Sequence, residues 1–169
     1  KIAVMADIGR TTKEDIRPKS ESVVDMVRVA CYIHQIPAAL EIVEDAHNKG
    51  YETCLNLMAI SKVSGNALDE ALELISKSKA DVIYLVDSFG SFYPEQIRDL
   101  TEKYLDFAEP NNKKLGIHAH NNQQLAFANT IESMMLGTSF LDVTIAGLGR
   151  GAGNCPMELL LGFLKNPKF

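Results

Sequence analysis

Residues 82–86 read VIYLV, an unbroken apolar run that is followed at once by Asp87 and Ser88. Because the side chains of a strand alternate between two faces, a run that is apolar throughout is buried on both faces. Burial on both faces is typical of parallel sheets whose strands are covered by helices. The stretch therefore predicts a parallel strand with polar side chains at its carboxyl end.

Similar apolar runs recur along the chain, and segments with helical spacing of apolar residues separate them. The other strand-like runs are residues 2–6, 26–32, 54–59, 115–120 and 140–145. The helical segments are residues 38–47, 68–77, a stretch that begins at Pro94, 125–136 and 156–164. This alternation predicts an α/β fold, either a barrel or an open doubly wound sheet.

A closed (β/α)8 TIM barrel needs eight strands, within about 200–250 residues. This chain has 169 residues and six strand-like runs. We therefore expect residues 1–169 to form one partial TIM-barrel catalytic domain. Two N-terminal βα units would lie outside this sequence, or another chain would cover the gap. The open edges of such a sheet favour association, so a homo-oligomer is one expectation.

The composition narrows the function classes. The net charge is −5, whereas binding to a phosphate backbone relies on clustered Lys and Arg, so we expect no nucleic-acid partner. No window approaches the ~18 consecutive apolar residues of a membrane span, so we expect no membrane partner. Three cysteines without metal-type spacing predict reduced, mostly buried thiols in a cytoplasmic protein.

His118 and His120 are the strongest functional signal in the chain. Residues i and i+2 of a strand point to the same face, so the two imidazoles can bind one cation together. Imidazole nitrogen combined with the amide oxygens of Asn121 and Asn122 suits an octahedral N/O site better than a structural zinc site. The alternative is a pair of histidines satisfied by backbone groups. The position of the pair at the end of a strand favours the metal.

A glycine-rich loop, residues 147–154 (GLGRGAGN), follows the sixth run and precedes the last helix. Its spacing also permits a GxGxxA dinucleotide motif, but that motif belongs to the first βα turn of a fold, and here the chain has almost ended. Asn154 could give its amide oxygen to the metal. Alternatively, it could cap the helix that follows Pro156. Both roles stay open.

Other polar residues also lie at or near the carboxyl ends of strands. Asp87 could orient a metal-bound histidine or cap the turn that follows it. Asn56 lies in an apolar strand, where a buried amide needs a partner. It could bind a substrate carboxylate, with Ser88 beside it, or make a structural hydrogen bond. His34 is a candidate base near the rim, whereas His47 is expected on a helix surface.

Two further residues have a simpler interpretation. Arg28, between two valines, could hold an anionic substrate, but a structural ion pair or a side chain that reaches the bottom of the barrel is favoured. Cys155 could act as a nucleophile, and a buried, unreactive thiol is the favoured interpretation.

Four sequence blocks together resemble the metal-dependent HMG-CoA lyase-like and pyruvate aldolase superfamily of TIM barrels. The resemblance is closest to the 4-hydroxy-2-oxovalerate aldolases, and it covers about residues 26–164. The blocks are residues 28–30 (RVA), 81–88 (DVIYLVDS), 116–122 (GIHAHNN) and 146–154 (AGLGRGAGN), with Pro156 and Glu158 beyond them. Residues 31–34 (CYIH) depart from the aldolase pattern.

The resemblance implies that His118, His120 and Asn154 bind a divalent cation, Mn²⁺ or Mg²⁺. In the family, a further aspartate ligand and a neighbouring arginine come from the first strand. The resemblance also implies that the six strands and their helices are strands three to eight of the barrel. Asp7 then follows strand three and does not correspond to that aspartate. The implied activity is a carbon–carbon lyase that cleaves or forms a 4-hydroxy-2-oxo acid through a pyruvate enolate, with a small 2-oxo acid as its substrate. The alternatives are an acyl- or carboxyl-transferase of the same superfamily, or a non-catalytic subunit with a remnant metal site.

Overall fold

The computed structural model describes residues 1–165, and its apolar runs form one sheet of six parallel strands. The strands are β1 (Ala3–Asp7), β2 (Met26–Cys31), β3 (Glu52–Leu57), β4 (Val82–Asp87), β5 (Lys114–Ala119) and β6 (Phe140–Leu141). Each strand pairs in parallel with the next one along the chain. In a doubly wound sheet the strand order reverses, whereas in a barrel it runs sequentially. The fold is therefore an open part of a TIM barrel.

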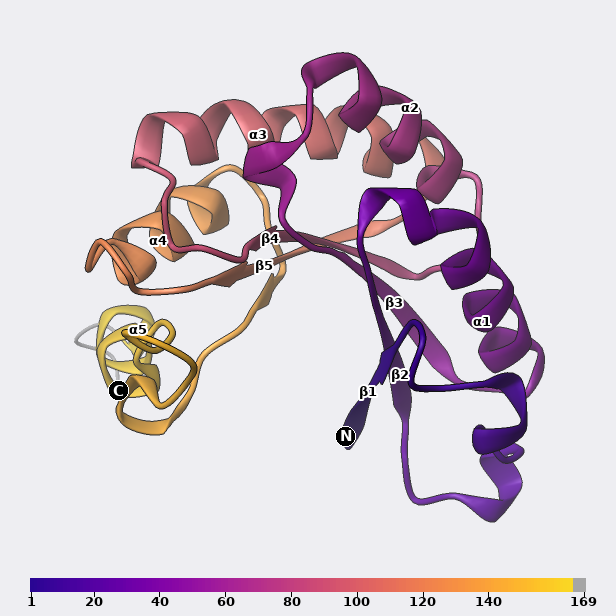
Figure 1. Ribbon diagram of the computed structural model, residues 1–169. Helices are drawn as coiled ribbons and strands as arrows, with labels where there is room; N and C mark the ends of the chain where they lie inside the picture. The colour runs from indigo at the N-terminus through magenta and orange to yellow at the C-terminus, as the bar shows by residue number, and fades with distance from the viewer. Residues whose placement is uncertain (166–169) are drawn as a thin grey trace.

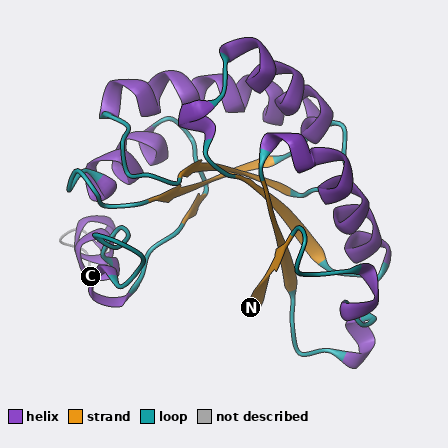
Figure 2. Ribbon diagram, in the orientation of Figure 1, coloured by secondary structure: helices purple, strands orange, loops and turns teal. Residues whose placement is uncertain are grey.

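The helices lie where helical spacing predicts them, and they form an arc along the outer side of the strands (Figure 1). Proline occupies the first turn of both the first and the third helix, where its missing N–H costs no hydrogen bond. Figure 2 shows the same arrangement as an inner layer of strands and an outer layer of helices. The helices are α1 (Ile36–Asn48), α2 (Gly65–Ser76), α3 (Pro94–Ala108), α4 (Ala126–Met135) and α5 (Met157–Lys165).

The sheet packs differently on its two faces. The outward side chains of neighbouring strands, such as Val29, Leu55 and Ile117, join the helices in one large core. The inward side chains form a smaller apolar cluster that includes Tyr84. A Cβ at Gly116 would lie 2.6 Å from the Tyr84 ring, so this position must be glycine for the ring to cross the inner face. The inner face is therefore filled near its base and becomes polar above it.

The last strand is shorter than its sequence predicts. A strand over residues 140–145 was expected, but β6 ends at Leu141. Beyond it, the N–H of Asp142 still donates to Ile117 O (3.0 Å), and the N–H of Thr144 donates instead to Cys155 O (3.1 Å). The prediction was wrong because the apolar run does not reveal that the returning chain replaces β5 as the hydrogen-bonding partner.

Two further features concern the surface. Residues 8–25, which are polar, contain two short 3₁₀ turns, Lys13–Asp15 and Lys19–Glu21. In the edge strand β1, Val4 and Met5 are exposed, as expected for a sheet that does not close. Within residues 1–165, each helix is too short or too polar to cross a bilayer.

Candidate metal and substrate site

His118, in β5, and His120, just after β5, point into one cavity on the inner face of the sheet. The ring centroids of His118 and His120 lie 5.1 Å apart, and the ring planes meet edge to face at 82°. Both side chains are partly buried and line a cavity of about 470 Å³. The i, i+2 spacing therefore brings the imidazoles together as predicted.

The cavity lies at the carboxyl ends of the strands, where α/β barrels bind their ligands. Every strand contributes to its wall, directly or through the loop that follows it. The lining residues are Met5, Arg28, Ala30, Tyr32, Asn56, Met58, Ala59, Val86, Ser88, Phe89, His118, His120, Asp142 and Arg150.

The environment of His120 favours the neutral imidazole. Burial lowers its pKa below the ordinary value, and the nearby charges of His118 and Arg150 lower it further. A metal ligand must present an unprotonated nitrogen. The surroundings of His120 therefore favour the form that binds a cation.

The glycine loop folds back onto β5 and places Asn154 beside His120. The two residues form an isolated antiparallel bridge, and the N–H of Asn121 donates to Gly153 O (2.8 Å). Gly153 has a φ of +88°, and a Cβ there would lie 2.0 Å from Gly147 O, so only glycine fits. The tight loop thus holds the backbone of Asn154 beside that of His120.

The Asn154 side chain is buried but only half satisfied. Its Nδ2 donates to Leu148 O (3.2 Å), whereas its Oδ1 is buried without a hydrogen-bond partner. An asparagine that caps a helix accepts hydrogen bonds through this oxygen, so Asn154 does not cap α5. A buried carbonyl oxygen without a partner, on a residue whose backbone pairs with His120, fits the donor set of an N/O metal site.

Beneath the histidines, Arg28 and Asp142 form an ion pair, and of the two the sequence analysis singled out only Arg28. Arg28 donates to Asp142 through Nη1 (3.1 Å to Oδ1) and Nη2 (2.5 Å to Oδ2). Asp142 Oδ2 also lies 3.0 Å from His118 Nδ1. The interpretation of Arg28 as an ion pair is confirmed. Asp142 was missed, although a carboxylate inside an apolar run at an inward position is a signal that could have found it.

The charges of this group stabilise one another. Burial by itself raises the pKa of the Asp142 carboxyl, but hydrogen bonds from His118 and Arg28 outweigh burial and hold the pKa below its usual value. Burial also acts to lower the pKa of Arg28, yet Asp142 raises it above normal. The guanidinium lies 4.4 Å from the centroid of the Tyr84 ring, a cation–π distance. The pair is therefore ionised and fixed in place.

Asn56 is brought to the same cavity. It is 4% exposed, its Oδ1 accepts a long hydrogen bond from Arg28 Nη2 (3.4 Å), and its Nδ2 has no partner. Buried amides in native proteins almost always pair. An unpaired donor on a cavity wall leaves a hydrogen bond available to a ligand.

Asp87 and Ser88 are both occupied by the backbone around them. The Asp87 carboxylate accepts the N–H groups of Ser91 (3.1 Å) and Phe92 (3.2 Å), so it caps the following turn. The carboxylate that contacts a histidine is that of Asp142, not that of Asp87. Ser88 lines the cavity, and its hydroxyl accepts the N–H of Ala59 (2.9 Å). The hydroxyl hydrogen of Ser88 remains available to a ligand.

Three other candidates lie outside the cavity. His34 is exposed and stacks on Tyr32, with the ring centroids 5.9 Å apart. Of these two residues, only Tyr32 lines the cavity. Cys155 is fully buried, and burial raises its pKa, so its thiol is no activated nucleophile. His47, on α1, lines a different pocket.

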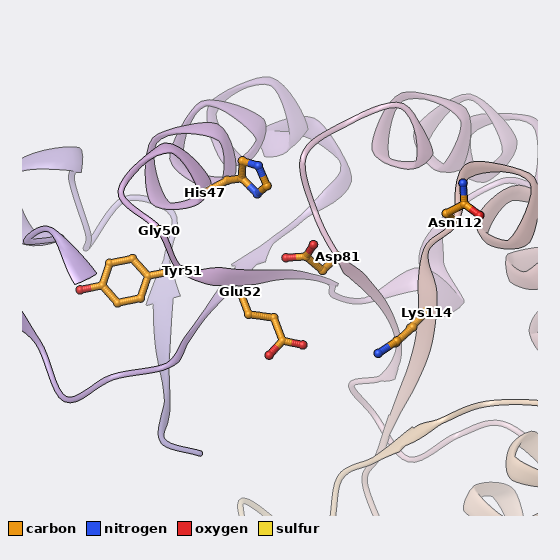
Figure 3. Close-up of a pocket in the computed structure, with 7 residues that line it drawn as sticks. All are labelled: His47, Gly50, Tyr51, Glu52, Asp81, Asn112 and Lys114. Carbon is orange, nitrogen blue, oxygen red and sulfur yellow. The ribbon is translucent and has the colours of Figure 1, made fainter. Parts of the chain in front are cut away.

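That second pocket, of about 450 Å³, lies at the amino ends of the strands. Figure 3 shows Asp81 between Glu52 and Lys114, which begin β3 and β5. Asp81 accepts the N–H of Thr53 (2.8 Å), and Glu52 pairs with Lys1 (2.6 Å). Both carboxylates are therefore already bound to partners within the chain.

Across residues 1–165, no three His, Cys, Asp or Glu side chains gather closely enough to hold a metal ion. The candidate site therefore consists of two imidazoles and one amide oxygen. Asn154 completes a set of three donors in which only the histidines are of the usual metal-binding types.

The chain is similar to known proteins over most of its length. The chain is 34% identical over 165 residues to a 4-hydroxy-2-oxovalerate aldolase of Pelotomaculum thermopropionicum, covering 98% of this chain and 48% of the relative. It is 33% identical over 141 residues to an oxaloacetate decarboxylase of Mycobacterium tuberculosis, covering 83% and 41%. The chain thus spans about half the length of the curated relatives it matches.

A solved structure shows the same fold. The N-terminal domain of a proposed aldolase from Bacteroides vulgatus superposes with a TM-score of 0.79 at 32% identity, covering 98% of this chain and 56% of that one. The sequence profile of the HMGL-like family matches residues 15–168. The match covers the sheet from β2 to β6, both histidines and the glycine loop, and the chain belongs to the HMGL-like family.

Proposed function

We propose that the intact protein is a divalent-metal-dependent aldolase that cleaves or forms a carbon–carbon bond of a 4-hydroxy-2-oxo acid through a pyruvate enolate. One observation carries the proposal: the ring centroids of His118 and His120 lie 5.1 Å apart on a cavity wall, and the backbone of His120 pairs with that of Asn154, whose Oδ1 is unpartnered. The family membership and the aldolase names of relatives support the reaction class.

His118, His120 and Asn154 would hold the cation, for which Mn²⁺ or Mg²⁺ suits the mixed N/O donors. When bound, such a cation supplies a Lewis acid that stabilises negative charge on the oxygens of a 2-oxo acid. The lowered pKa of His120 keeps its nitrogen available for this role.

Substrate binding falls to the polar groups of the same wall. Asn56 Nδ2 is a buried donor without a partner, and the Ser88 hydroxyl lies on the same surface. A carboxylate accepts hydrogen bonds only, so both donors suit it. We propose that these two residues orient the carboxylate of a small 2-oxo acid.

The two catalytic candidates from the sequence have weaker support. Asp87 already accepts two backbone N–H groups, which leaves it poorly placed to move a proton. His34 is exposed and lies beyond the cavity wall. The proposal therefore rests on the metal and substrate residues. The cytoplasmic location, the homo-oligomer and the lack of a nucleic-acid partner stay predictions.

The test uses the intact protein with His118→Ala, His120→Ala and the double variant. We expect Mn²⁺ binding, followed by calorimetry, to be lost in the double variant. Metal-dependent release of pyruvate should fall by at least about 10³-fold, because the Lewis acid contributes several kcal/mol. His47→Ala is the matched control, since that histidine lies on α1 at the second pocket.

Unchanged metal stoichiometry and turnover in a folded double variant would refute the site. Turnover that requires acetyl-CoA would instead assign the protein to the acyl-transferases of its superfamily. Folding of each variant is checked by circular dichroism.

A further inference from the structure

Two residues beneath the metal site are bound to one another and to one of its histidines. Asp142 Oδ2 lies 3.0 Å from His118 Nδ1, and Arg28 binds both oxygens of that carboxylate. We propose that Asp142, held by Arg28, is a positioning residue that keeps the His118 proton on Nδ1 and leaves Nε2 free to bind the cation. The inference rests on the proposed metal site and adds residues that determine its geometry.

The tautomer follows from the donors and acceptors present. A neutral imidazole carries one N–H and one lone pair, and the partner of one nitrogen decides the state of the other. An ionised carboxylate can only accept, so the nitrogen that faces Asp142 must carry the hydrogen. Because Nδ1 faces the carboxylate, Nε2 has the lone pair.

Asp142 is itself held by Arg28, and Arg28 is supported in turn by Tyr84. The two guanidinium contacts fix both oxygens in a bidentate pair, which is directional as well as strong. Arg28 in turn lies over the Tyr84 ring (4.4 Å), which occupies the space that Gly116 leaves open. The side chains of β2, β4 and the residue after β6 thus form a support for the ring of His118.

The contrast with His120 sharpens the inference. Among the described residues, the ring of His120 has no carboxylate partner. Its main-chain N–H donates to the main-chain oxygen of Asp87 (3.2 Å). Ligating histidines usually donate their second ring nitrogen to a carboxylate or a carbonyl. The two proposed ligands therefore differ, and only the tautomer of His118 is determined by a charged side chain.

The first experiment measures the tautomer directly in the metal-free intact protein. At pH 8 an ordinary imidazole is neutral, so ¹⁵N chemical shifts of the ring report which nitrogen carries the hydrogen. We expect His118 in the wild type to be protonated on Nδ1. In Asp142→Asn, Arg28 needs the remaining amide oxygen, so the NH₂ group turns towards His118 and moves the ring proton to Nε2.

The second experiment measures Mn²⁺ affinity by calorimetry. Loss of an outer partner of a ligating histidine costs about 10–100-fold in metal affinity. Asp142→Asn should show that loss. The single variant also leaves Arg28 buried without its counter-ion, which lowers stability for a separate reason.

A double variant, Arg28→Met with Asp142→Leu, separates positioning from structure. It removes both charges, and apolar side chains of similar volume often restore stability at such sites. We expect its thermal midpoint to recover while its Mn²⁺ affinity stays about 10–100-fold below wild type. His47, on α1 at the second pocket, serves as an internal control, because its ring shifts should not follow residue 142.

Recovery of Mn²⁺ affinity together with stability in the double variant would overturn the positioning role. An Nε2-protonated His118 in the wild type would overturn it independently of any metal. Absence of Mn²⁺ binding by the wild type would refute the proposed function, and the ring shifts would still decide the role of Asp142.

Discussion

The two ends of the sheet carry pockets of nearly equal size, about 470 Å³ at the carboxyl ends and about 450 Å³ at the amino ends. Their polar groups differ in what they bind. At the amino ends, Asp81 accepts the N–H of Thr53, and Glu52 binds Lys1. At the carboxyl ends, Asn56 Nδ2 and Asn154 Oδ1 are buried without partners.

This difference identifies the functional end better than size does. A buried polar group without a partner costs about 1–3 kcal/mol, so a protein retains one where a ligand or solvent completes it. The carboxylates of Asp81 and Glu52, at the amino ends, already have partners within the fold. Four substitutions test this division between a ligand-binding end and a structural end.

The largest effect is expected at Asn154. Asn154→Ala removes one proposed ligand and should weaken Mn²⁺ binding by about 100-fold, the upper end of the range for supporting residues. The free energy of unfolding should fall by no more than about 1 kcal/mol, because the variant loses one hydrogen bond, from Nδ2 to Leu148 O, while the lost Oδ1 has no partner in the fold. Asn111→Ala makes the same chemical change at an exposed residue and should leave affinity unaltered. Equal affinities in the two variants would remove Asn154 from the site.

Next comes Asn56. Asn56→Leu removes a hydrogen bond to a charged substrate group, and we expect KM for the 2-oxo acid to rise by about 10-fold. The same variant removes a buried unsatisfied donor, so the free energy of unfolding should increase by about 1 kcal/mol. Steady-state kinetics and urea unfolding give the two values. A loss of stability with unchanged KM would reverse the assignment.

Thr53, on the same strand but at the structural end, should behave in the opposite way. Its hydroxyl donates to Lys79 O (2.9 Å), and Thr53→Val keeps the shape while removing that bond. The free energy of unfolding should fall by about 1 kcal/mol with unchanged KM. An altered KM here would show that the two ends are coupled.

The smallest effect is expected for Glu52→Gln. The partner, Lys1, has a side chain that is 75% exposed, and exposed ion pairs contribute little to stability. Neither the thermal midpoint nor the kinetic constants should change measurably. A clear loss of activity would indicate that the amino-end pocket also binds a ligand.

The sequence predicted the elements well because periodic burial is a local property. Apolar runs located five strands closely and indicated that a sixth exists. Both His118 and His120 point into the cavity, because residues i and i+2 of a strand share a face. Periodicity alone did not separate a barrel from a doubly wound sheet, because strand order depends on pairing between distant segments. The strand count and the family resemblance predicted a partial TIM barrel, which the sequential strand order confirms. The end of β6 was misjudged for the same reason: the N–H of Asp142 still bonds to β5, but that of Thr144 bonds to Cys155 O.

The sequence predicted which candidate side chains share one cavity, and their roles stay predictions. His118, His120, Asn56 and Ser88 meet on one wall, and Asn154 lies beside His120. The competing roles of Asp87 and Asn154 depended on single hydrogen bonds that spacing does not specify. The structure assigns the turn cap to Asp87 and excludes the helix cap for Asn154.

The ion pair between Arg28 and Asp142 has a consequence for folding. It joins residues 114 positions apart, so it closes a very long loop whose entropic cost rises with loop length. Contacts of such high sequence separation slow folding, because the chain loses loop-closure entropy before the contact can stabilise it. The ring of His118 thus acquires its support only after β2 and the segment behind β6 have both joined the sheet, and a chain still short of that stage lacks the scaffold of the proposed metal site.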